Sequence, residues 1–174
     1  MLPSYLVTML RPTSLLASFV LGLHAWAQAP LLPQDLAPFL GSWTGELAYL
    51  DYSSGALVHI PATLLLQPVE ARSWRMGLGY TEEPHANALD TIMLAADGRS
   101  FDGAAVLEVV RLAPDSVRIV FEAPGDDDEL PATLRRTWSA GPHRCTLQKE
   151  VRYTAPPAGK PTGWFVRHTY TFTH

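Results

Sequence analysis

Three basic side chains occupy matching positions in three successive apolar segments near the C-terminus. They are Arg136, Lys149 and His168, in residues 131–139, 143–153 and 163–173. Side chains of a β-strand point alternately to its two faces, and this alternation places all three on the apolar face of their segments. Cations that lie among apolar groups can bind the carboxylate or phosphate of an amphiphile. The pattern predicts a cavity with a cationic floor.

Aromatic residues share this inward face. Tyr153 and Tyr170 fall near the three bases in register, and Trp74 and Trp138 fall on the inward face of their own segments. Glu108 is also predicted to point inward, where it could pair with one of the bases. Two alternatives stay open: a satisfied internal salt bridge, or a β-bulge that turns one of these residues outward.

The single cysteine suggests a second kind of chemistry. Cys145 could act as a nucleophile with His143 or His168 as its base. A catalytic thiol needs an activating base and access to solvent. Cys145 falls in an apolar inward row, where a packed and inert thiol is the usual role. An enzyme in the same cavity therefore stays an alternative, and we assign no catalytic residue.

An acidic run offers a third kind of chemistry. Residues 126–129 carry four consecutive carboxylates. Calcium-binding loops need alternating oxygen ligands and a glycine at the sharp turn, and this run has neither. We therefore predict a solvated hairpin tip with no bound metal. Asp97 and Asp102 flank another turn and are interpreted as turn formers.

The segments that position these residues are predicted to be β-strands. Nine short β-type segments alternate with turn signals, and their short connections favour antiparallel neighbours. They are residues 42–52, 57–67, 72–80, 89–95, 104–112, 116–122, 131–139, 143–153 and 163–173. We predict an all-β fold, a meander closed into a barrel of about 8–10 strands with its first and last strands paired. A two-sheet sandwich is the alternative, and residues 34–40 are expected to form one short helical turn.

The head of the first predicted strand carries a family resemblance. Leu40-Gly-Ser-Trp-Thr-Gly45 resembles the Gly-x-Trp signature of lipocalins and, more broadly, the calycin barrels. The chain is most similar to secreted bacterial lipocalin-like proteins, a group with no assigned chemistry. This resemblance implies structural roles for Gly41, Trp43 and Gly45. It also implies that a basic residue of the last strand packs on Trp43, and Arg167 is the candidate.

The spacing of Gly41, Trp43 and Gly45 is also similar to the opening of the nitrobindin-type haem barrels. That resemblance implies haem as an alternative ligand, with His168 on the iron. A lone histidine on an apolar face is more often a hydrogen-bonded core residue. The main expectation therefore contains no cofactor.

The N-terminus has the features of an export signal. Arg11 precedes an apolar run, residues 15–23, which is too short to span a bilayer. Small-x-small patterns follow it and end at Ala27 and Ala29, the two candidate cleavage sites. We predict a signal peptide over residues 1–27, a barrel domain over residues 28–174, and a secreted or periplasmic location. A buried N-terminal helix is the alternative.

The overall charge limits the class of partner. The formal net charge of the chain is −4, and cleavage would remove Arg11 and no acidic residue. An acidic domain is a poor partner for nucleic acid or an anionic membrane surface. We therefore expect a small hydrophobic or amphiphilic ligand. A filled barrel that works through its outer surface is the remaining alternative, and the sequence does not indicate an oligomeric state.

Overall fold

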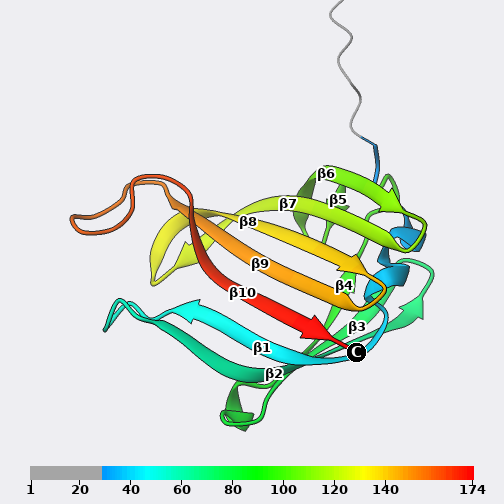
Figure 1. The fold of residues 1–174 in the computed structure, drawn as a ribbon. Helices are drawn as coiled ribbons and strands as arrows, with labels where there is room; N and C mark the ends of the chain where they lie inside the picture. The colour runs from blue at the N-terminus through cyan, green and yellow to red at the C-terminus, as the bar shows by residue number, and fades with distance from the viewer. Residues whose placement is uncertain (1–28) are drawn as a thin grey trace, which may run out of the picture.

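The computed structural model describes residues 29–174 and shows one antiparallel sheet curled into a nearly closed barrel (Figure 1). The predicted signal peptide lies outside the described residues. Among those residues, no helix is long and apolar enough to cross a membrane. The strands are β1 (Gly41–Leu50), β2 (Leu57–Glu70), β3 (Ser73–Tyr80), β4 (Ala88–Met93), β5 (Ser100–Phe101), β6 (Ala104–Ala113), β7 (Ser116–Asp127), β8 (Leu130–Gly141), β9 (Arg144–Tyr153) and β10 (Phe165–Thr173).

The strands form a meander in which the first and last strands pair. The order is β4-β3-β2-β1-β10-β9-β8-β7-β6-β5, and β1 pairs with β10 as predicted. The two sheet edges meet at a seam between β4 and β5, which a single bridge joins, from Leu94 to Phe101. Nine of the ten strands match predicted segments. The two-residue β5 was missed because it is too short to show an alternating pattern.

A short helix closes one end of the barrel. The 3₁₀ helices are η1 (Pro33–Phe39), which matches the predicted helical turn, and η2 (Pro84–Ala86). Leu36 and Phe39 of η1 are fully buried, and Phe39 packs 5.7 Å from Trp138 between ring centroids. Asp35 forms a 2.6 Å ion pair with Arg111 of β6. Apolar burial and this ion pair therefore hold η1 in the end of the barrel.

The Gly-x-Trp-x-Gly segment has structural roles at this closed end. Trp43 is 1% exposed, and its indole N–H donates to the carbonyl of Phe39 at 2.9 Å. Gly41 has a positive φ of 109°. At Gly45 a Cβ atom would lie 2.8 Å from the Cα of Phe172, because β1 and β10 approach closely there. Each glycine therefore meets a backbone requirement that other residues meet poorly.

Two bulges change the predicted faces. On β6 the register shifts between Val106 and Glu108, so Glu108 points outward and forms a 2.8 Å ion pair with Arg118. The prediction of an inward Glu108 was wrong, because the extra residue of a bulge reverses the alternation beyond it. On β10 a shift between Val166 and His168 leaves Val166 47% exposed, although strict alternation would place it on the same face as His168.

Candidate functional site

The three predicted bases form one row across the barrel wall. Arg136 pairs with Lys149 in the register of β8 and β9, and Lys149 pairs with His168 in that of β9 and β10. Phe121 and Tyr49 continue the row on the flanking strands. No bulge interrupts β8 or β9, so alternation predicted these positions correctly.

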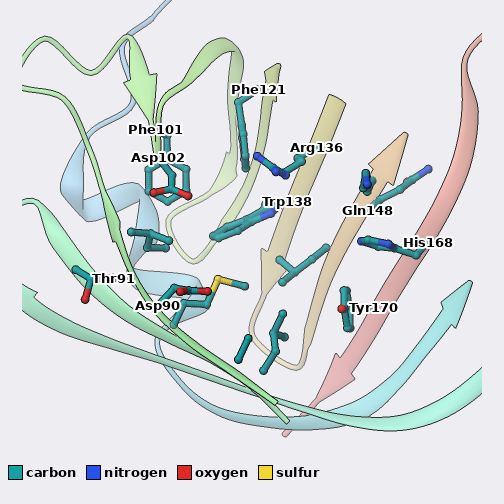
Figure 2. A pocket seen from close by; sticks show the side chains of 16 residues that line it. Asp90, Thr91, Phe101, Asp102, Phe121, Arg136, Trp138, Gln148, His168 and Tyr170 are labelled. Atoms are coloured by element: carbon teal, nitrogen blue, oxygen red, sulfur yellow. The ribbon is translucent and has the colours of Figure 1, made fainter. Parts of the chain in front are cut away.

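This row forms part of the wall of a cavity of about 470 Å³ (Figure 2). Arg136, Lys149 and His168 line it, as do the predicted Trp138 and Tyr170. The rest of the lining is mostly apolar. It includes Met76, Leu78, Ile92, Phe101, Phe121 and Leu147. The volume falls in the usual range for small-molecule sites, about 300–1,000 Å³.

A second cavity meets the first at the same bases. It has about 340 Å³, and Lys149 and His168 line both cavities. Glu83, Asp127 and Arg167 lie on its wall. Lys149 and His168 therefore lie between the two cavities, whereas Arg136 lines only the first.

A buried carboxylate neutralises part of this charge. Asp127 is 7% exposed and accepts hydrogen bonds from Lys149 Nζ at 3.1 Å, Tyr52 at 2.6 Å and Tyr153 at 3.0 Å. The guanidinium of Arg167 lies 3.5 Å from the same carboxylate. Burial by itself raises the pKa of Asp127. Hydrogen bonds from Tyr52 and Lys149, with the charge of Lys149, outweigh burial, and the pKa lies below its ordinary value. Asp127 is therefore an internal counter-ion.

Sequence reasoning missed Asp127. It placed residues 126–129 in a solvated tip, but β7 continues through Pro124 and Gly125 to Asp127. Alternation from Phe121 along this longer strand points Asp127 inward, so the signal was present. Pro124 and Gly125 concealed it, because these residue types usually end a strand. The tip itself is a two-residue hairpin, Asp128-Glu129, with φ of 52° and 61°.

His168 is neutral at physiological pH. Burial is the main cause that lowers its pKa to about 4, with a further contribution from the charges of Lys149 and Arg167 and an opposing one from Asp127. Its ring packs edge-on against Tyr170, 5.3 Å between centroids. The imidazole can therefore donate or accept a hydrogen bond without adding charge to the cavity.

Arg136 has no counter-ion among the residues that the structure describes. Within residues 29–174 its guanidinium forms no ion pair and no hydrogen bond, whereas Lys149 and Arg167 share Asp127. Two like charges at paired positions of neighbouring strands destabilise a sheet. An unpaired cation in a partly buried position is therefore costly unless it has a partner that is not part of the fold.

The other predicted side chains lie close to the cavity without lining it. Trp74 is 4% exposed and packs against Phe101 at 6.3 Å. Tyr153 is 4% exposed and belongs to the hydrogen bonds around Asp127. Burial is the main cause that raises the pKa of the Tyr153 phenol. Both support neighbouring side chains from behind the cavity wall.

The geometry does not bring the proposed nucleophile to its base. Cys145 pairs with Phe172, four residues along β10 from His168. The thiol is fully buried, and burial raises its pKa to about 12. A catalytic cysteine must be accessible to the substrate and ionised to the thiolate. Cys145 is neither accessible nor ionised at neutral pH.

The two family resemblances imply roles for two residues of β10: His168 as the ligand of a haem iron and Arg167 as the residue that packs on Trp43. The His168 imidazole is neutral, but the charges of Lys149 and Arg167 act on it directly. These cations disfavour a further positive charge, such as that of an iron ion, beside the imidazole. Arg167 lies over the Tyr52 ring at 4.0 Å, and His174 stacks on Trp43 at 3.6 Å. His174 therefore has the place that was expected for Arg167. The register of β1 and β10 puts the end of β10 beside the start of β1 and puts Arg167 beside Leu50, at the other end of β1.

Comparisons of the chain with models of protein families, with curated proteins and with solved structures found no match.

Proposed function

We propose that this chain is a lipocalin-like barrel that binds a small anionic amphiphile without covalent chemistry. The observation that carries the proposal is Arg136, an unpaired guanidinium on the wall of a mostly apolar cavity. An acidic head group would supply the missing counter-ion, and the aromatic and aliphatic walls would hold the apolar part. His168 and Tyr170 would contribute neutral hydrogen-bonding groups beside the head group.

The state of the neighbouring bases supports Arg136 as the main anchor. Lys149 and Arg167 already share the carboxylate of Asp127. An anion that approached Lys149 would have to compete with this buried carboxylate. An anion at Arg136 meets no such competitor, so it gains the full benefit of a charge-assisted hydrogen bond.

We also propose that the protein is exported. The support is local: Leu31 is fully buried and its N–H donates to the carbonyl of Gly98 at 3.0 Å. Packed structure is thus present from Leu31 on, close after the predicted cleavage sites at Ala27 and Ala29. Expression of residues 1–174 in a bacterium, followed by cell fractionation and N-terminal sequencing, tests this. A product in the periplasm or medium that starts at Gln28 or Pro30 is expected, and a full-length cytosolic product would contradict it.

The binding experiment uses two fluorescent probes that differ by one anionic group. They are 1-anilinonaphthalene-8-sulfonate and N-phenyl-1-naphthylamine, its analogue without the sulfonate. Calorimetric and fluorescence titrations would compare the wild type with Arg136→Gln and with Arg118→Gln. Both variants lose one positive charge, but Arg118 lies on the outer surface with Glu108.

We expect a change in affinity only where the variant lacks Arg136 and the probe carries the sulfonate. Arg136→Gln should weaken sulfonate binding by about 10- to 100-fold, the value of a hydrogen bond to a charged group, and leave the neutral probe unchanged. Arg118→Gln should change neither. Near-UV circular dichroism would verify that each variant keeps its packing. Equal sulfonate affinities of the wild type and Arg136→Gln would refute the proposal.

A further inference from the structure

The larger cavity carries unpaired charge of both signs. Asp90 of β4 and Asp102 of the turn between β5 and β6 line it together with Arg136, and both aspartates are also exposed to solvent. Figure 2 shows the two carboxylates on one side and Arg136 on the other, with Trp138 between them. Within residues 29–174, none of these three side chains forms an ion pair or a hydrogen bond. The opposite charges face each other across the cavity and do not meet.

The fold holds the two carboxylates in place. Asp90 pairs with Met76 in the register of β3 and β4, and Ile92, two residues further on, points inward and is 5% exposed. Alternation therefore directs Asp90 inward as well. Asp102 has a φ of 50°, and its N–H donates to the carbonyl of Met93 at 2.7 Å. Strand pairing and the turn therefore fix the backbone positions of the two residues.

An aromatic surface separates the two charged sides. Phe101, Phe121 and Trp138 pack edge to face, with centroid distances of 5.3 Å, 5.4 Å and 5.5 Å. Phe101 directly precedes Asp102, so aromatic rings and a carboxylate lie on the same side. Ring faces and carboxylates both attract cations, and together they recognise ammonium groups.

We infer that the ligand is a zwitterion that spans the cavity, with its anionic group at Arg136 and its ammonium group at Asp90 and Asp102. The apolar chain between the two groups would lie over the aromatic surface. This inference rests on the proposed function, because it keeps Arg136 as the anchor. It adds the substrate class: an ω-ammonium acid rather than a simple fatty acid.

Matched straight-chain probes can test this by calorimetry. The zwitterions are 6-aminohexanoate, 8-aminooctanoate and 11-aminoundecanoate, each compared with the unsubstituted acid of the same chain length. The wild type would be compared with Asp90→Asn/Asp102→Asn. The control is Asp115→Asn/Asp126→Asn, which removes the same charge from two exposed positions outside the cavity.

At one chain length, the wild type should bind the zwitterion at least about tenfold more tightly than the acid, the value of one compensated charge. Asp90→Asn/Asp102→Asn should abolish this preference and keep the affinity for the acid, and the control should retain the preference. If every acid binds as tightly as its zwitterion while the sulfonate probe still depends on Arg136, the inference is wrong and the proposed function stands. Loss of the Arg136 dependence itself would refute the proposed function.

Discussion

At the residue scale, one barrel layer contains more positive charge than the fold neutralises. Arg136, Lys149 and His168 are neighbours in register. His168 avoids the repulsion by staying neutral, and Lys149 by pairing with Asp127. Within residues 29–174, Arg136 is the member of this row that stays charged and forms no ion pair. Proteins tolerate such costs mainly at functional sites, where the missing partner is a ligand.

The neutral state of His168 predicts a pH-dependent stability. Its pKa is about 4 in the folded protein against an ordinary value of 6.5. Between these values the unfolded chain binds a proton that the folded protein does not, so stability falls as the pH falls from 6.5 to 4. The loss should reach about 3 kcal/mol. Urea unfolding at a series of pH values measures it.

Replacement of the histidine is the control for this pH effect. His168→Gln should flatten the dependence above pH 4. The pKa of Asp127 is lowered from 3.8, so the stability that it contributes is lost only below that window. A wild-type stability that is constant from pH 6.5 to 4 would contradict the assignment of a neutral His168.

Removal of the internal counter-ion should be costly. Asp127→Asn leaves Lys149 and Arg167 without a negative partner in a layer that already contains Arg136. We expect a loss of about 3 kcal/mol in the free energy of unfolding, as for other broken buried ion pairs. Glu108→Gln, which removes an exposed partner of Arg118, should cost less than about 1 kcal/mol. Chemical denaturation of both variants measures the difference, and equal losses would show that Asp127 is not the counter-ion.

At the element scale, strand alternation predicts the site only where the strands are regular. Arg136 on β8 and Lys149 on β9 were placed correctly because the register between these strands is continuous. Glu108 was misplaced because a bulge on β6 adds one residue that single-sequence patterns do not reveal. Asp127 was missed because a proline and a glycine inside β7 suggest a strand end. The fold class follows from many segments together, whereas each site residue depends on one local register.

The approach of β1 to β10 gives a prediction for the glycine motif. Gly45→Ala would place a Cβ atom 2.8 Å from the Cα of Phe172, where backbone and not a flexible side chain has to move. We expect a loss of about 1–3 kcal/mol in the free energy of unfolding, as for overpacked cores. The matched control is Gly163→Ala, since no atom lies within 4 Å of its Cβ position. That variant should stay within about 0.5 kcal/mol of the wild type in thermal and urea unfolding. Equal stabilities of the two variants would contradict the close approach.

At the scale of the whole molecule, the barrel wall is weakest at the seam between β4 and β5. The helix η1 closes one end, and each strand from β3 to β7 in the sheet order pairs with two neighbours. Beyond them, β6 pairs with β7 but meets the two-residue β5 only at Ala104 and Ala105. At the seam, β4 has a partner only on its β3 side, and a single bridge links the following residues to β5 (Figure 1). The seam also contains Asp90 and Phe101, which line the larger cavity. Opening of the seam would therefore expose the cavity to solvent through the wall of the barrel.

Hydrogen exchange measured by mass spectrometry tests this weakness of the seam. Amides of β4 should exchange at least about tenfold faster than those of β8, because local opening requires fewer broken contacts at an edge strand. A ligand that touches β4 and β5 together would bridge the seam. Saturation with 1-anilinonaphthalene-8-sulfonate should therefore slow exchange in β4 more than in β9, whose neighbours are fully paired on both sides. If β4 and β8 exchange equally slowly, or if the probe slows β9 as much as β4, the seam is not the place where the barrel opens.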